Sequence, residues 1–250
     1  MIELLGVGVP RKDGWFLHRV CARILRGELT AVCSVDPAER GALLTAISGG
    51  AVPKEGRVWV SGVPLVSGRV ARVRQLVANI DLASPLVERR SVIWNCLSRH
   101  PRLGGLNGLF RFPRASERRG ATRALARVGL QARSGEPVSA LGPLDRTRLR
   151  MARSLWRDPE FLVVAEPETA LSADDAGACL ELLKRLSHEE RMGVVVSGMP
   201  SSMILQRADR VIDLYEGLLV FDGIPADLLR RLETPTGREA RRGAWQPRQV

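Results

Sequence analysis

Histidine and aromatic residues are scarce in this sequence, and their scarcity excludes several functional classes. Only 4% of the 250 residues are aromatic, and there are three histidines, His18, His100 and His188. His188-Glu-Glu-Arg lacks the second histidine of a zinc-protease helix, and no serine lies in a G-x-S-x-G elbow. The pair Gly6-Val-Gly8 has no third glycine of a dinucleotide-binding loop. The sequence therefore indicates no histidine-based metal site, serine-hydrolase site or dinucleotide site.

Cysteine pairs and long apolar runs are also missing. The four cysteines, Cys21, Cys33, Cys96 and Cys179, are widely spaced with no C-x-x-C pair, which argues against a zinc site and a disulfide framework. We expect reduced thiols in the core. No apolar run approaches the ~20 residues that span a bilayer, and the N-terminus lacks the pattern of a signal peptide. We expect any membrane association to go through a partner.

The charge is strongly basic, with a formal net charge of +11, and it comes mainly from arginine. Such a balance is typical of proteins that bind nucleic acid or anionic lipid. The basic residues are scattered, however, and no aromatic side chains interleave with them to form a single-strand platform. We favour an arginine-rich solvated surface. Nucleic-acid or anionic-lipid binding stays as the alternative. Residues 234–250 are expected to form a loose, basic tail that could take part in such binding.

The order of strand and helix patterns predicts an α/β domain with a parallel sheet. A chain of 250 residues with 45% hydrophobic residues can bury a full core, which we place in one domain over residues 1–233. The core is expected at about residues 1–86 and 159–233, and a helical subdomain at about 87–158. The expected strands lie at 29–33, 57–60, 76–80, 161–165, 194–197, 210–214 and 218–222, and the expected helices at 43–47, 121–128, 144–155 and 179–186.

The most informative segment is the apolar run at residues 161–165, which is followed by Glu166 and Pro167. A buried parallel strand delivers an acid to the edge of a sheet in this way. The segment resembles the Walker B strand of ABC-type ATPases, where Asp-Glu-Pro follows four apolar residues. By this resemblance Ala165 replaces the metal-anchoring aspartate, and Glu166 stands at the general-base position. An ordinary core strand that ends in an exposed acid is the alternative for this segment alone.

Residues 1–233 as a whole resemble the ATP-binding subunit of ABC transporters, and most closely that of phosphonate importers. The narrower likeness rests on residues 86–97, 108–110 with 118–130, and 208–212 with 220–228. The resemblance implies a P-loop NTPase fold with a parallel sheet core, an antiparallel β edge and an inserted helical subdomain. It also implies ATP and Mg²⁺ as ligands. The implied partners are transmembrane permease subunits and a second ATP-binding subunit, at the cytoplasmic face of the membrane.

Residues 34–42 align with the family's phosphate loop, G-x-x-G-x-G-K-S/T. In that pattern backbone N–H groups and the lysine hold phosphate oxygens, and the hydroxyl reaches magnesium. Pro37 removes a donor, Glu39 adds negative charge and Gly41 removes a metal ligand, so we expect a remodelled turn from strand to helix. In this sequence Ser34, Pro37 and Glu39 replace the glycines, Arg40 replaces the lysine, and Asp36, Gly41 and Ala42 fill further loop positions.

The other family motifs are altered as well. The glutamine that contacts magnesium and water matches Leu82, and the switch histidine matches Met199; neither side chain can do this work. The adenine-stacking aromatic falls on Arg11, with Trp15 or Phe16 as alternatives. The signature Leu-Ser-Gly-Gly-Gln matches residues 141–145, where Gly142, Pro143, Leu144 and Asp145 occupy its last four positions.

These substitutions predict that the chain keeps the fold but has impaired or absent ATP hydrolysis. Glu166 is the one catalytic group in place, and it lacks a metal, a phosphate loop and a switch histidine to act with. Subunits of this family pair head to tail, so an intact partner would restore neither composite site fully. Three functions stay open: an impaired ATP-binding subunit of a phosphonate importer, a non-enzymatic scaffold with the same fold, and a basic protein that binds nucleic acid or anionic lipid.

Overall fold

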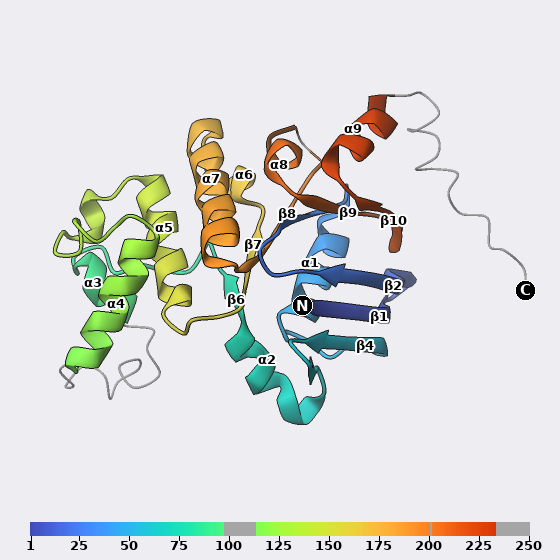
Figure 1. Cartoon of the computed structure of the whole chain (residues 1–250), viewed down its shortest axis with the longest axis horizontal. Helices are drawn as coiled ribbons and strands as arrows, with labels where there is room; N and C mark the ends of the chain where they lie inside the picture. The colour runs from blue at the N-terminus through green and yellow to red at the C-terminus, as the bar shows by residue number, and fades with distance from the viewer. Residues whose placement is uncertain (98–113, 201, 234–250) are drawn as a thin grey trace, which may run out of the picture.

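The computed structural model describes residues 1–97, 114–200 and 202–233, which form two sheets flanked by helices (Figure 1). The larger, six-stranded sheet has the order β10-β9-β3-β8-β7-β6. Its strands are parallel except for the β9–β10 pair, so the predicted parallel core with an antiparallel edge is confirmed. The strands are β3 (Leu29–Cys33), β6 (Val77–Ile80), β7 (Phe161–Ala165), β8 (Gly193–Gly198), β9 (Arg210–Tyr215) and β10 (Leu218–Gly223).

A second, four-stranded sheet is antiparallel and has the order β2-β1-β4-β5. It contains β1 (Ile2–Arg11), β2 (Gly14–Ile24), β4 (Glu55–Val60) and β5 (Val63–Pro64). The strand predicted at residues 57–60 is confirmed as β4, which pairs antiparallel with β1 in this second sheet. The β1–β2 hairpin was not predicted. Its signal is Asp13-Gly14, a dipeptide that favours tight hairpin turns.

Two apolar clusters cover the two faces of the larger sheet. Ala31 and Cys33 of β3 belong to one cluster, and Val32 between them belongs to the other, as the period of two along a strand requires. The first cluster joins the sheet to α7 (Ala173–Glu190) and to the inserted helices. The second joins it to α1 (Pro37–Ile47) and the antiparallel sheet. Burial on both faces explains why these strands are apolar almost throughout.

Helices α3 (Val92–Leu97), α4 (Ala115–Arg127) and α5 (Pro143–Leu155) contact one another and form the helical insertion (Figure 1). Gly129, with φ of +76°, follows α4. The expected strand at 76–80 begins one residue later, because Leu76 ends α2 (Val70–Leu76). Residues 108–110 of the family likeness and the tail at 234–250 lie outside the described residues. The other helices are α6 (Pro167–Ala170), α8 (Ser202–Arg207) and α9 (Pro225–Glu233).

The cysteines differ from the prediction at one position. Cys33, Cys96 and Cys179 are buried, but Cys21 is exposed on β2. Burial raises the pKa of the Cys96 and Cys179 thiols to about 12, because the thiolate would lose its hydration. Among the described residues, no helix combines the length and the apolar character that a membrane span needs.

Candidate functional site: a capped phosphate-loop region

The carboxyl ends of β3, β7 and β8 meet at one edge of the larger sheet. The register places Cys33 beside Gly198 and Ala165 beside Ser197. Glu166 continues this contact, because its backbone N–H donates to the carbonyl oxygen of Ser197 at 2.9 Å. The loops that follow these strands are where ligands bind in parallel sheets. The structure therefore brings the aligned loop residues, Glu166 and the segment that leads to Met199 to one edge.

Leu82 and Met199 have contrasting surroundings at this edge. Leu82 follows β6, whose Ile80 pairs with Val164 of β7, and its side chain packs partly buried against the apolar core. Met199 is 56% exposed. Neither side chain offers a strong hydrogen-bonding group toward the edge of the sheet.

Helix α1 begins at Pro37, not at the predicted residue 43. Asp36 is its N-cap, and the carboxylate accepts a hydrogen bond from the Ala38 N–H at 2.8 Å. Pro37 fills the first helical position, and Glu39 lies in the first turn. A capping carboxylate, an early proline and a first-turn acid together favour a helix start. The residues aligned with the second half of the phosphate loop are therefore the first turn of a helix.

Glu39 is turned into the protein, with only 3% of the residue exposed. Its Oε2 accepts from the hydroxyl of Ser34, and its Oε1 accepts from the backbone N–H of Gly217, each at 2.7 Å. Gly217 has φ of +79° in the β9–β10 turn, and its carbonyl accepts from the backbone N–H of His18 at 2.7 Å. The carboxylate thus ties the start of α1 to the hairpin turn and, through it, to β2. The sequence predicted that Glu39 adds negative charge to the loop surface. The structure instead buries this carboxylate.

Arg40 is also buried, at 5% exposure, and each of its three guanidinium nitrogens donates a hydrogen bond. One Nη donates to the carbonyl oxygen of Ser34, and Nε donates to Oε1 of Glu166 at 3.2 Å. The second Nη pairs with the same carboxylate oxygen. Glu166 itself has left-handed backbone geometry, with φ of +47°. The retained general-base position is therefore held in an ion pair with the residue that replaces the phosphate-binding lysine.

The charges around this turn do not favour a phosphate chain. Asp36, Glu39 and Glu166 supply three carboxylates. Arg40 and the more distant Arg11, 4.0 Å from Asp36, supply two guanidinium groups. The first backbone donor of α1 is already used by Asp36, and the carboxylates offset the helix dipole. An incoming triphosphate would meet excess negative charge, and it would find the N–H of Ala38 already bonded to Asp36.

The aligned signature lies at the start of α5, in the helical insertion and apart from α1 (Figure 1). Gly142 is the N-cap, Pro143 occupies the first turn, and Leu144 packs partly buried against the apolar core. Asp145 accepts from Arg133 at 2.5 Å and from Arg148 at 3.0 Å. This second helix start is therefore also closed by proline and a paired carboxylate.

Comparison with known proteins identifies the family. No protein-family profile matches the chain. The phosphonates import ATP-binding protein PhnC 2 of Halalkalibacterium halodurans is 30% identical over 219 residues, which cover 85% of this chain and 88% of that protein. PhnC 1 of Trichodesmium erythraeum is 29% identical over 237 residues, or 92% and 93% of the two chains. The chain belongs to the phosphonate-import ATP-binding protein family.

Solved structures show the same fold. The ADP conformation of MJ1267, an ATP-binding cassette of an ABC transporter, superposes with a TM-score of 0.83 at 17% identity and covers 97% of this chain and 98% of that one. The cbiO1 protein of Clostridium perfringens gives 0.79 at 19% identity, with 96% and 93% covered. The predicted P-loop NTPase fold of the ABC ATPase type is confirmed.

The phosphonate-import family implies Mg²⁺, and the residues of this chain do not fit it. Magnesium prefers oxygen ligands in octahedral geometry. Ala165, Gly41 and Leu82 stand at the aligned positions, and none has a side-chain oxygen. Across residues 1–97, 114–200 and 202–233 there is no cluster of three histidine, cysteine or acidic side chains suited to a metal. We therefore derive no step through a metal ion.

Trp15 and Phe16, the two alternatives for the adenine-stacking aromatic residue, have different surroundings. Trp15 stacks on His18, with ring centroids 5.3 Å apart. Phe16 instead lines a mainly apolar cavity of about 420 Å³ beside Ala38 and Ala42 of α1. Of the two aromatic residues, Phe16 thus faces the helix that carries the altered loop.

Proposed function

We propose that this chain is an ATP-binding-subunit homologue of the phosphonate-import type that does not hydrolyse ATP with its own phosphate-loop region. The start of α1 is the main support. Asp36 and Pro37 turn the aligned loop into a capped helix, and Glu39 fastens that helix to Gly217. Pro37 has no N–H, Asp36 already accepts from the N–H of Ala38, and Ala165 and Gly41 offer no side-chain oxygen to a metal.

The state of Glu166 supports the same proposal. A general base needs an unpaired carboxylate within reach of its proton donor. Here Arg40 donates to that carboxylate from two nitrogens, with the pair largely shielded from solvent on the arginine side. The ion pair occupies Oε1 of this carboxylate and holds the side chain against Arg40. Glu166 then serves to close the turn after β7 and to neutralise Arg40.

We place the chain as a structural or regulatory subunit, built of one domain over residues 1–233 with a helical subdomain at about 87–158. The relatives are named import ATP-binding proteins, which supports permease subunits and a second ATP-binding subunit as partners at the cytoplasmic face of the membrane. In a head-to-tail pair, an intact partner would meet the closed α5 start in one composite site and the closed α1 start in the other.

The basic surface gives less support to nucleic-acid binding. Phosphate contacts require arginines that are not already matched by carboxylates. Arginines on several elements pair with acidic side chains at 2.5 to 2.8 Å; these are Arg127, Arg133, Arg146, Arg207 and Arg210. The charge of these five arginines is thus balanced within the protein.

Steady-state ATPase assays of the purified chain and of Glu166→Gln test the proposal. We expect both to match a protein-free blank, because Glu166 has no reaction to promote. Glu189→Gln, an exposed acid at the end of α7, is the matched control for the charge change. A magnesium-dependent rate that Glu166→Gln lowers by about tenfold or more, while Glu189→Gln does not, would overturn the proposal.

A further inference from the structure

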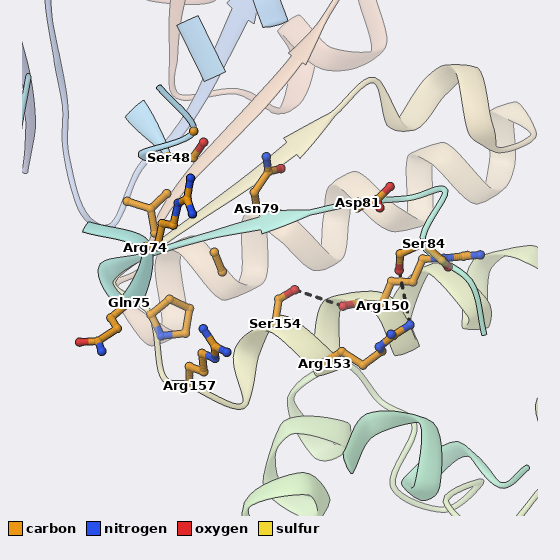
Figure 2. Close-up of a pocket in the computed structure, with 14 residues that line it drawn as sticks. Ser48, Arg74, Gln75, Asn79, Asp81, Ser84, Arg150, Arg153, Ser154 and Arg157 are labelled. Carbon is orange, nitrogen blue, oxygen red and sulfur yellow. Dashed lines mark hydrogen bonds between the residues drawn. The ribbon is translucent and has the colours of Figure 1, made fainter. Parts of the chain in front are cut away.

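A second cavity, of about 320 Å³, lies between the larger sheet and the helical insertion (Figure 2). Residues of α2 and β6 form one wall, and the C-terminal half of α5 with the turn after it forms another. This cavity is separate from the start of α1. The residues near α1 that line it, Ser48 and Gly50, follow the C-terminal end of that helix. The charged side chains of the lining, together with Asn79 of β6, are Arg74, Asp81, Arg150, Arg153 and Arg157.

The lining is strongly positive. Four arginines face a single carboxylate, Asp81, whose Oδ1 already accepts from the backbone N–H of Ala83 at 2.9 Å. Arg74, Arg150 and Arg157 form no ion pair with any carboxylate in the described parts of the chain. Arg133, by contrast, forms an ion pair with Asp145 at 2.5 Å. The cavity therefore concentrates positive charge that Asp81 and the nearby Glu88 balance only in part.

Two of these guanidinium groups are held in place by carbonyl oxygens. Arg74 donates from Nε to the carbonyl of Gly49 at 2.9 Å, and Arg150 donates from Nε to the carbonyl of Ser84 at 3.0 Å. Within the described residues, neither arginine uses its terminal nitrogens in a hydrogen bond with protein. A guanidinium group fixed at Nε presents its terminal N–H groups as a fork, the geometry that binds oxyanions.

The other polar side chains complete the wall. Arg153 donates to the carbonyl of Pro85 at 3.0 Å, and Arg157, which is exposed, makes no hydrogen bond with the described residues. Asn79 lies on β6 between the two ends of the cavity (Figure 2). Burial, followed by the positive charge of Arg146, lowers the pKa of Arg150. An anion in the cavity would relieve both the lost hydration and the repulsion between like charges.

We propose that this cavity binds a small oxyanion with two or more negative charges, of the phosphate or pyrophosphate class. Its volume is at the low end of the range of small-molecule sites, about 300–1,000 Å³, and suits a compact anion. An anion in this cavity would lie between α2 and α5 and so link the sheet to the helical insertion. The proposal does not depend on the fate of ATP at α1.

Calorimetric titration of the full chain with pyrophosphate tests this site, with inorganic phosphate, glycerol phosphate and sulfate as further ligands. We expect one saturable site for pyrophosphate, weakened about tenfold by Arg150→Gln and by Arg157→Gln. Comparison of phosphate with glycerol phosphate separates a free ion from a phosphate monoester. Arg123→Gln, which removes the same charge from the exposed face of α4, should change the affinity less than about twofold.

Three results would overturn the proposal. They are no saturable binding of pyrophosphate, equal weakening by Arg123→Gln, and loss of binding on Arg40→Gln with Arg150→Gln unchanged. The last result would place the anion at α1 instead. If Arg150→Gln lowers the thermal stability of the free protein, the exposed Arg157→Gln decides the question alone.

Discussion

Two helix starts, those of α1 and α5, have the same local pattern but different surroundings. Each has proline in its first turn and an acid two residues later, Pro37 with Glu39 and Pro143 with Asp145. A proline sacrifices no helical hydrogen bond there, and an acid offsets the helix dipole. Both starts align with places where the family holds phosphate. We infer that the same change alters the two halves of the proposed composite nucleotide site together.

The two acids differ in what they stabilise. Glu39 is buried and bonds to Gly217, a residue 178 positions away, so it connects separate parts of the fold. Asp145 keeps a 19% exposed side chain and pairs with Arg133 and Arg148 nearby in sequence. Buried, hydrogen-bonded charges cost far more to disrupt than partly exposed ion pairs. We therefore expect α1 to be closed by the tertiary structure and α5 by a local network.

The largest effect is expected for Glu39→Ala. Its removal leaves the Ser34 hydroxyl and the Gly217 N–H without their partner inside the protein, which should lower the free energy of unfolding by about 3 kcal/mol. Urea unfolding monitored by circular dichroism measures the change. Glu189→Ala, at an exposed position, should change it by less than about 0.5 kcal/mol. Equal effects of the two substitutions would show that the hydrogen bonds of Glu39 to Ser34 and Gly217 do not stabilise the tertiary structure.

The next effect is a gain of function by restoring the family pattern. The variant combines Ser34→Gly, Pro37→Gly, Glu39→Gly, Arg40→Lys and Gly41→Ser with Ala165→Asp. We expect magnesium-dependent ATP binding at least about tenfold tighter than in the native chain, because backbone donors, a lysine and metal ligands are returned. The same variant with alanine at position 40 should lose that gain. A folded variant without tighter binding would show that the loop is not what excludes ATP.

The smallest effect is expected for Asp145→Ala. The lost ion pairs with Arg133 and Arg148 should lower the free energy of unfolding by about 1 kcal/mol at low salt, and by less at high salt because of screening. Urea unfolding at two ionic strengths measures both values. An effect as large as that of Glu39→Ala, or one insensitive to salt, would remove the contrast between the two helix starts.

The sequence predicted the features that depend on local pattern. The run at residues 161–165 was correctly read as a buried strand, and the apolar stripe at 144–155 as a helix. The start of α1 was missed although its signal is local. Asp36, Pro37 and Glu39 form a helix-start pattern, but the alignment with a phosphate loop led us to expect a turn up to residue 43.

Tertiary pairings could not be predicted in the same way. Arg40 and Glu166 are 126 positions apart, and periodicity gives no information on which side chains meet across a sheet edge. The same holds for Arg74 and Arg150, which line one cavity from α2 and α5. In the sequence they were part of a scattered basic composition, and only the fold shows that they line one cavity without an ion pair to any carboxylate of the described residues.

The most direct test of the central claim is calorimetric titration of the native chain with ATP and magnesium, repeated with EDTA in place of the metal. The closed start of α1 predicts no magnesium-dependent binding up to millimolar ATP; any weak, metal-independent heat should disappear in Arg150→Gln and persist in Arg40→Gln. Micromolar binding that requires magnesium and is abolished by EDTA would contradict the account, because it would show that the capped helix start still holds a nucleotide.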